Sequence, residues 1–245
     1  HLPQMTVDVE LKETNIIQER DEIISFISEA CGINDRTEIN INSTIPVGRG
    51  LGSSAALSIA IARAKKLTNI REIADKCEKF IHGNPSGIDV NQVLSDTPLL
   101  FSKKDGAIPL DFNLDSYLLI IDTGVIGITK ETLKHIKQNF ENYKSYIDEL
   151  GEITEKVIEP LKKKAIEIVG AYMYKAHGLL QKLGVSHESN DDVVNICKNN
   201  GALGAKLTGG GAGGCCIALS KTKENAEKIQ NELAKKGYKS WIVTV

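Results

Sequence analysis

Two glycine-rich stretches constrain the fold of this chain more than any other feature. The first, P-V-G-R-G-L-G-S-S-A-A, spans residues 46–56 and runs directly into an alanine-rich apolar segment that predicts a helix. Glycine lets the backbone N–H groups of a loop turn toward one point, and a helix N-terminus adds unpaired donors and a partial positive charge. The stretch therefore predicts an anion site, and a nucleotide phosphate is the obvious anion. The hydroxyls of Ser53 and Ser54 lie at its mouth, within reach of a phosphate or a bound Mg²⁺.

Length and composition narrow the class of protein. The 245 residues suffice for one large domain or two modest ones, and the net charge of −2 gives no electrostatic reason to expect nucleic acid as a partner. The five cysteines contain no C-x-x-C pair, and their odd number argues against a disulfide framework and for a reducing cytoplasm. The sequence contains no run of eighteen apolar residues and no secretory segment, so a membrane partner is not expected.

Hydrophobic periodicity predicts a chain of mixed helices and strands. The expected strands cover residues 7–11, 37–45, 98–101, 107–110, 117–121, 202–208, 215–219 and 239–245. The expected helices cover residues 21–30, 54–67, 71–82 and 225–236, together with two long helical stretches that are separated near Pro160 and end near residue 184. A division near residues 111–116 gives two domains, residues 1–112 and 113–245.

Three kinds of nucleotide loop compete for the first glycine stretch. A Walker A loop requires G-x-x-x-x-G-K-[ST], but Ser53 follows Gly52 and no lysine is present to meet the phosphates. A Rossmann fingerprint is formally matched, since residues 50–55 fit G-x-G-x-x-A and Glu72 lies about twenty residues further on. The preceding strand alternates polar and apolar residues, whereas Rossmann strands are buried on both faces, and Pro46 interrupts the tight turn. Both of these interpretations are disfavoured.

A second signal, E-K-F-I-H-G-N-P-S-G-I-D, covers residues 78–89 and carries two carboxylates. Glu78 lies in the last turns of a predicted helix, and Asp89 follows a turn that reverses the chain. Such a pair can divide its work, one carboxylate holding Mg²⁺ and the other taking a proton from an alcohol. A helix C-cap followed by a polar turn explains the same spacing equally well. His82 is interpreted as a helix-end residue rather than a catalyst.

The second glycine stretch, G-A-K-L-T-G-G-G-A-G-G-C at residues 204–215, runs into an apolar strand, unlike a flexible linker. Together the stretches resemble the GHMP kinases, the family of galactokinase, homoserine kinase, mevalonate kinase and phosphomevalonate kinase. The first stretch is similar to that family's loop P-x-x-x-G-L-G-S-S-A-A, and the second to its motif K-[LM]-[ST]-G-[AG]-G-x-G-G. The segments H-G-N-P-S-G-I-D and D-T-G-V-I-G-I-T most resemble the mevalonate kinases of Gram-positive bacterial type.

The resemblance implies an α+β, two-domain GHMP kinase fold. Its sheets would be mixed or antiparallel and covered by helices, with the active site in the interdomain cleft. It implies ATP-dependent phosphorylation of the primary alcohol of mevalonate, a step of isoprenoid precursor synthesis, with Mg²⁺ as cofactor and ATP as co-substrate. The expected partners are these small molecules, with no nucleic acid and no membrane, and a homodimer is left open.

The resemblance also implies the role of each site residue. Asp89 would be the catalytic base, and Ser54 and Glu78 would hold Mg²⁺. The residues expected to contact the acceptor are Ser86, Thr129 and Ala212. The residues expected to bind ATP are Pro46, Gly48, Arg49, Gly50, Leu51, Gly52, Ser53, Ser54, Ala55, Gly209, Gly210 and Gly211.

The chain departs from the family pattern in one respect. GHMP kinases normally begin with a motif like P-G-K-[VI]-x-L-x-G-E-H, and no such stretch occurs here; a missing start and a weak or inactive enzyme are both consistent with this. One alternative function is that of phosphomevalonate kinase or galactokinase, although a phosphorylated acceptor calls for extra basic residues beside Asp89 and the N-P-S-G turn shows none. The other is a non-catalytic protein that binds ATP or a metabolite, against which the presence of Glu78 and Asp89 weighs.

Overall fold

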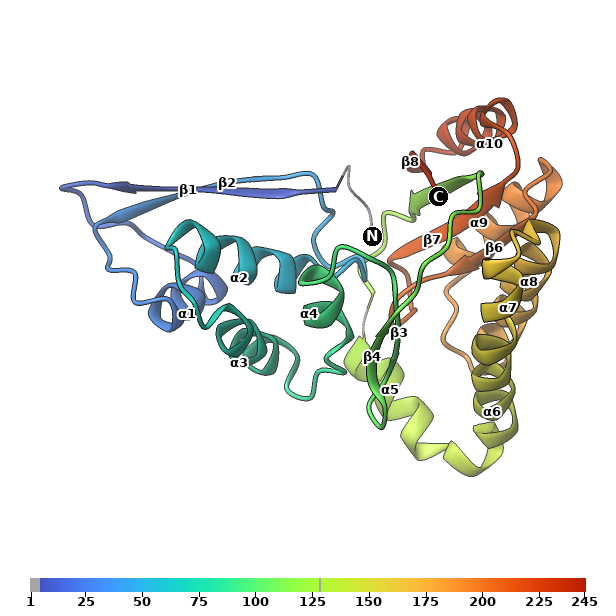
Figure 1. The fold of residues 1–245 in the computed structure, drawn as a ribbon, viewed down its shortest axis with the longest axis horizontal. Helices are drawn as coiled ribbons and strands as arrows, with labels where there is room; N and C mark the ends of the chain where they lie inside the picture. Colours follow the sequence, from blue (N-terminus) through green and yellow to red (C-terminus); the bar gives the residue numbers. More distant parts are fainter. Residues whose placement is uncertain (1–4, 128) are drawn as a thin grey trace. The chain divides into compact units, whose positions relative to one another are not determined.

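The computed structural model describes residues 5–127 and 129–245, without the side chains of residues 129–131 and 133 (Figure 1). The chain forms two compact units. The N-terminal unit comprises the residues up to Val47 together with Gly52–Leu110, and the C-terminal unit comprises Gly48–Leu51 together with Asp111–Val245. The chain divides between residues 110 and 111, two residues before the predicted domain boundary. The sequence did not predict that Gly48–Leu51 belong to the C-terminal unit.

The N-terminal unit packs helices against an antiparallel strand pair. Its elements are β1 (Val7–Glu13), α1 (Glu22–Ala30), β2 (Thr37–Ser43), α2 (Ser53–Ala64), α3 (Ile70–His82), α4 (Ile88–Val93), β3 (Leu99–Ser102) and β4 (Gly106–Pro109). β1 pairs with β2, β3 pairs with β4, and α2 lies between the β1–β2 pair and α3 (Figure 1). Val9 and Ile39 of the alternating strands pack against a buried cluster that includes Ile27, Ile61 and Cys77.

The C-terminal unit is built on a four-stranded antiparallel sheet with the order β6-β7-β5-β8. Its strands are β5 (Tyr117–Asp122), β6 (Gly204–Leu207), β7 (Cys215–Ser220) and β8 (Lys239–Thr244). Its helices are α5 (Thr129–Gln138), α6 (Phe140–Lys156), α7 (Ile158–Lys162), α8 (Ile166–Lys182), α9 (Glu188–Asn199) and α10 (Lys223–Lys235). In the sequence, one or more helices stand between consecutive strands of this sheet, except for β6 and β7, which the second glycine stretch joins directly.

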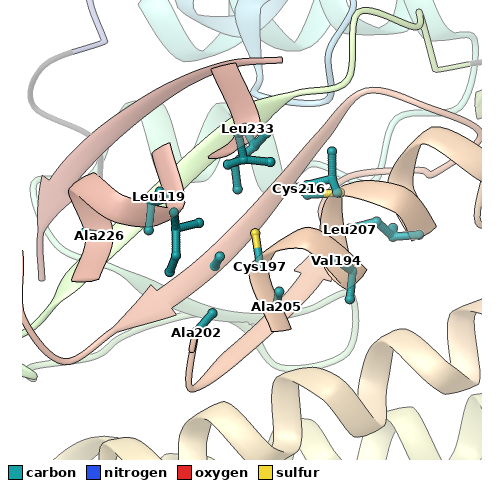
Figure 2. Close-up of a cluster of buried hydrophobic side chains, with 13 residues drawn as sticks. Leu119, Val194, Cys197, Ala202, Ala205, Leu207, Cys216, Ala226 and Leu233 are labelled. Carbon is teal, nitrogen blue, oxygen red and sulfur yellow. The ribbon is translucent and has the colours of Figure 1, made fainter. Parts of the chain in front are cut away.

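Both faces of this sheet are covered. Leu119 on one face packs with Cys197 of α9 and Leu233 of α10 in one buried cluster (Figure 2). The neighbouring Leu118 points to the opposite face, where Met173 of α8 belongs to a second cluster. Because successive side chains of a strand point to opposite faces, burial on both sides explains the uninterrupted apolar run of β5.

Two helices were missed in the sequence analysis. The six-residue α4 begins after Gly87 and places Asp89 in its first turn, where the sequence suggested only a polar turn. α9 carries few apolar residues and has an unusual cap, in which the His187 side chain accepts a hydrogen bond from the Ser189 N–H and the Asn190 side chain accepts one from the His187 N–H. This capping box contains neither the usual serine or threonine nor the usual glutamate or glutamine. Its sequence signal is therefore weak.

All five cysteines are buried and free. Within residues 5–127 and 129–245, each helix is either too short or too polar to cross a bilayer.

Candidate active site

The first glycine loop has an alternating backbone. Gly48, Gly50 and Gly52 have φ angles of 70°, 73° and 66°, whereas Arg49 and Leu51 between them do not have positive φ. Such alternation turns successive N–H groups toward the same side and forms an anion-binding concavity. All three glycines therefore use the left-handed region, and anion binding by the loop stays a prediction.

The loop ends at the N-terminus of α2. Gly52 is the N-cap residue, and within the described part of the chain no side chain caps this helix. The first intrahelical bond runs from the Ala56 N–H to the Gly52 carbonyl, so the preceding N–H groups have no partner inside the helix. These free donors and the positive end of the helix dipole favour an anion here.

Asp89 lies against the end of this loop. A Cβ atom built on Gly52 would be 3.2 Å from Asp89 Oδ1, so only glycine gives the carboxylate this close approach without a shift. Burial raises the pKa of Asp89, and the nearby His82 opposes that shift. The chain therefore brings a partly desolvated carboxylate to the first residue before α2.

Glu78, Ser54 and His82 form a polar cluster in the same unit. The Ser54 hydroxyl lies 3.1 Å from His82 Nε2, and Glu78 Oε2 lies 3.6 Å from the same nitrogen. Glu78 is only 2% exposed, and its Oε1 has no hydrogen-bond partner among the described residues. Burial raises the pKa of Glu78, while a hydrogen bond from Ser54 and the charge of His82 act in the opposite direction.

This cluster fits a magnesium ion better than a transition metal. Mg²⁺ prefers oxygen ligands and commonly uses one or two protein oxygens together with substrate phosphates and water. Glu78 Oε1 is a buried oxygen without a partner in the described chain, and the Ser54 hydroxyl supplies a second oxygen nearby. Within residues 5–127 and 129–245, no group of three or more histidine, cysteine, aspartate or glutamate side chains is placed to hold a metal by itself. A cation here would complete its coordination with oxygens from a bound ligand or from water.

The second glycine loop, residues 208–214, is held by hydrogen bonds within the C-terminal unit. The Asn190 side chain donates to the Gly213 carbonyl at 3.0 Å and accepts from the Gly213 N–H at 3.1 Å. The Ala212 N–H donates to the Val185 carbonyl at 2.8 Å. A Cβ atom on Gly211 would lie only 2.1 Å from that same carbonyl oxygen. These bonds fix the shape of the loop.

The first loop contacts the second through main-chain atoms. A Cβ atom on Gly50 would lie 3.3 Å from the Gly209 Cα, and one on Gly209 would lie 3.0 Å from the Gly50 Cα. The Arg49 carbonyl accepts a hydrogen bond of 3.0 Å from the Cys215 N–H. Gly48–Leu51 therefore pack as a part of the C-terminal unit, to which the second loop belongs.

The Arg49 side chain is occupied by the segment that follows β5. Its Nε lies 3.0 Å from Asp122 Oδ1, and its Nη2 donates to the Gly124 carbonyl at 3.0 Å. The structure therefore shows protein partners for a side chain that the sequence analysis placed among the ATP ligands. Binding of ATP by Arg49 stays a prediction.

The structure gathers the predicted residues in two groups. Ser54, Glu78 and Asp89 meet around Gly52 in the N-terminal unit, and Gly48–Leu51 meet the second glycine loop in the C-terminal unit. Gly209 and Gly210 are exposed, as a ligand contact requires.

The remaining predicted residues differ in what they can offer. The side chain of Ala55 is buried in a cluster with Ile59 and Val90, so only its N–H can face a ligand. The Ser86 hydroxyl is exposed and accepts a bond from the Ile88 N–H, and the Ala212 N–H is occupied by Val185. Pro46 and Ser53 are partly buried beside the loop. Thr129 begins α5, but its side chain lies outside the described part of the structure.

Sequence reasoning missed three residues that shape the site. His82 does end α3, as interpreted, but it also contacts Ser54, and its position four residues after Glu78 on one helix was the available signal. Asp122 stands in a quoted motif without a role assigned to it. Asn190 gave no signal, because its partners in the second loop are 23 residues away in sequence.

Comparisons with known proteins decide the family. The profile of the GHMP kinases N terminal domain matches residues 15–95, which include the first glycine loop, Glu78 and Asp89. The profile described as GHMP kinases C terminal matches residues 157–239, which include the second loop. A mevalonate kinase from Thermococcus sibiricus is 33% identical over 83% of this chain and 68% of that protein, and one from Pyrococcus furiosus is 32% identical over 91% and 75%. The chain belongs to the GHMP kinase family.

Solved structures agree with this assignment. A mevalonate kinase from methicillin-resistant Staphylococcus aureus has a TM-score of 0.74 and 27% identity over 97% of this chain and 86% of that chain. The Leishmania major mevalonate kinase in complex with R-mevalonate has a TM-score of 0.84 over 98% and 86%, and at 23% identity it shows the fold alone. The predicted two-domain GHMP kinase fold is confirmed. The finer resemblance to enzymes of Gram-positive bacterial type stays a prediction.

Proposed function

We propose that this GHMP kinase transfers the γ-phosphoryl group of ATP to the primary alcohol of mevalonate. The observation that carries the proposal is the position of the Asp89 carboxylate against Gly52, at the junction of an anion-binding loop and a helix N-terminus. The relatives that are 32–33% identical support mevalonate as the acceptor, because they are mevalonate kinases.

In the proposed reaction the triphosphate is bound by main-chain donors of residues 48–54, by the hydroxyls of Ser53 and Ser54, and by residues 209–211. The alcohol oxygen attacks the γ-phosphorus, the bond to the β–γ bridging oxygen breaks, and ADP leaves. Asp89 would accept the proton of the alcohol. Burial raises the pKa of Asp89 toward the working pH, which strengthens it as a base, and His82 opposes full protonation.

Ser54 and Glu78 would hold Mg²⁺, which when bound neutralises charge on the transferred phosphoryl group. The oxygen of Glu78 without a partner in the described chain supports this assignment. We also propose Ser86, Thr129 and Ala212 as contacts to the acceptor. A cytoplasmic location is a prediction of the sequence alone, and a homodimer stays open.

The test is release of ADP, coupled to a reporter reaction, with mevalonate, phosphomevalonate, galactose and homoserine as separate acceptors. We expect turnover with mevalonate that requires Mg²⁺. Preference for another acceptor would reassign the enzyme within the family. Binding of ATP without turnover on any acceptor would favour the non-catalytic alternative.

A further inference from the structure

We propose that Arg49 is a positioning residue, which holds the middle of the first glycine loop in the C-terminal unit through Asp122 and Gly124, and does not bind ATP with its side chain. The inference rests on the proposed function only where ATP binding is measured. The role of Arg49 in holding the loop rests on contacts within the C-terminal unit alone.

The loop backbone shows why such a residue is needed. Gly48–Leu51 belong to the C-terminal unit, whereas the residues on either side belong to the N-terminal unit. Four residues cannot bury a core of their own. Their main-chain contacts with this unit include the bond from the Cys215 N–H to the Arg49 carbonyl and the close approach of Gly50 to Gly209.

The side chain of Arg49 adds a directional link. Asp122 Oδ1 lies 3.0 Å from Arg49 Nε and also accepts a 2.9 Å bond from the Gly124 N–H, while the Gly124 carbonyl accepts from Arg49 Nη2. The two side chains of the ion pair are 17% and 14% exposed. The segment after β5 is thus folded around the guanidinium group.

The remaining donors of Arg49 argue against direct binding of a phosphate. Nη1 is buried and has no hydrogen-bond partner among the described residues. Because Nη1 is buried, a ligand oxygen could reach it only if the groups that cover it moved away, and Nε and Nη2 already bond to Asp122 and Gly124. Lysine cannot reproduce the arrangement, because an ammonium group lacks the planar fork that meets a carboxylate and a carbonyl together.

A mere contribution to stability explains the arrangement poorly. Buried ion pairs contribute little net stability, since the desolvation of both charges offsets their attraction, and an unpaired buried donor adds a further cost. What the pair supplies is position. Removal of one partner alone leaves an uncompensated charge and costs stability, so the double variant, which removes both charges, should show the defect in loop order and ligand binding without a large loss of stability.

The test compares Arg49→Met, Arg49→Lys, Asp122→Asn and the double variant Arg49→Met/Asp122→Asn with the wild-type protein. The matched control is Lys221→Met, which removes a cation from the exposed ion pair with Glu167 in the same unit. Hydrogen exchange without nucleotide is followed in peptides that cover residues 48–52, 122–127 and 208–216. Calorimetry gives the Kd for ATP in the presence of Mg²⁺.

We expect the amides of Gly124 and Cys215 to exchange at least about tenfold faster in Arg49→Met and in Asp122→Asn, and not in the control. The Kd for ATP should rise about 10- to 100-fold in both single variants, and the double variant should match the weaker single variant within about threefold. Arg49→Lys should resemble Arg49→Met.

Three outcomes would overturn the proposal. Unchanged exchange in Arg49→Met combined with weaker ATP binding would make Arg49 a direct ligand. Full recovery by lysine would mean that charge alone acts on the phosphates, and losses that multiply in the double variant would show that the two residues act separately. If Arg49→Met does not fold, Arg49→Lys and Asp122→Asn decide by the same measurements. If the wild-type protein binds no ATP, the proposed function fails, and hydrogen exchange alone decides the role of Arg49.

Discussion

In the N-terminal unit the candidate catalytic groups have few partners, whereas in the C-terminal unit the second glycine loop is extensively bonded. Glu78 keeps a buried oxygen without a partner in the described chain, and burial raises the pKa of both Glu78 and Asp89. By contrast, Asn190 hydrogen bonds both main-chain groups of Gly213, and Val185 accepts from Ala212.

The two carboxylates are thus candidates for a role in the reaction, whereas Asn190 and Val185 fix the conformation of the loop. Desolvated carboxylates destabilise the folded protein, and they are kept at sites where a ligand or a reaction needs them. A loop whose main chain is bonded at several points gains stability but adapts less. Substitutions in the carboxylate region should therefore reduce activity and leave stability intact, whereas substitutions in the loop scaffold should reduce stability.

The largest effect is expected for Asp89→Asn. Loss of a positioned base should lower kcat about 10²- to 10⁴-fold, equivalent to about 3–5 kcal/mol. The melting temperature should not fall, because the amide removes a charge that burial disfavours. Steady-state kinetics and thermal unfolding check both parts. Asp96→Asn, at an exposed position of the same unit, serves as the control, and turnover of Asp89→Asn at the control's level would refute the role of Asp89.

Gly211→Ala tests the scaffold. The new Cβ atom would meet the Val185 carbonyl oxygen at 2.1 Å on a residue with φ of 78°. We expect the free energy of unfolding to fall by about 3 kcal/mol, which lowers the melting temperature by roughly 6–12 °C for a chain of this size. Gly237→Ala isolates the cost of the backbone angle, because Gly237 has φ of 85° and open space around its Cβ direction. Equal losses in the two variants would mean that the contact with Val185 is irrelevant.

Asn190→Ala should have the next largest effect. It leaves both the N–H and the carbonyl of Gly213 buried without their side-chain partner, and it removes the acceptor for the His187 N–H that caps α9. A loss of about 2 kcal/mol in unfolding free energy is expected from unpaired buried groups. Chemical denaturation measures it, with the exposed Asn231→Ala as a control that should stay near the wild-type value. A loss no greater than that of the control would show that Asn190 does not support the loop.

The sequence predicted the local features of the site better than its long-range contacts. The three glycines of the first loop and the helix after it were predictable, because glycine content and hydrophobic periodicity act over a few residues. The membership of Gly48–Leu51 in the C-terminal unit was not, since it depends on contacts with Asp122 and Gly209 that lie far along the chain. α9 was missed for a local reason, as its cap uses His187 and Asn190.

The smallest effect, and the one that most sharpens the comparison, is expected for Glu78→Gln. The pKa of Glu78 is raised by burial, against the opposing effects of Ser54 and His82, so ionisation in the folded protein costs free energy. Below the ordinary glutamate pKa of about 4.3 the carboxyl is neutral in both states and contributes no difference. As the pH rises above that value, the unfolded protein loses this proton first, and the wild-type protein loses stability relative to Glu78→Gln until the folded protein has ionised too.

At pH 7 Glu78→Gln should therefore be more stable than the wild type without nucleotide or Mg²⁺, by less than the losses expected for Gly211→Ala and Asn190→Ala. Thermal unfolding measured between pH 4 and pH 8 should show the gap opening with increasing pH. The charges of His82, Asp89 and Asp75 also act on Glu78, and repeating the series in an Asp89→Asn background removes the titration of Asp89 from the comparison. A variant that is less stable than the wild type throughout this range would mean that the Glu78 carboxylate stabilises the fold. The contrast between destabilising carboxylates in the N-terminal unit and stabilising bonds in the second glycine loop would then not hold for Glu78.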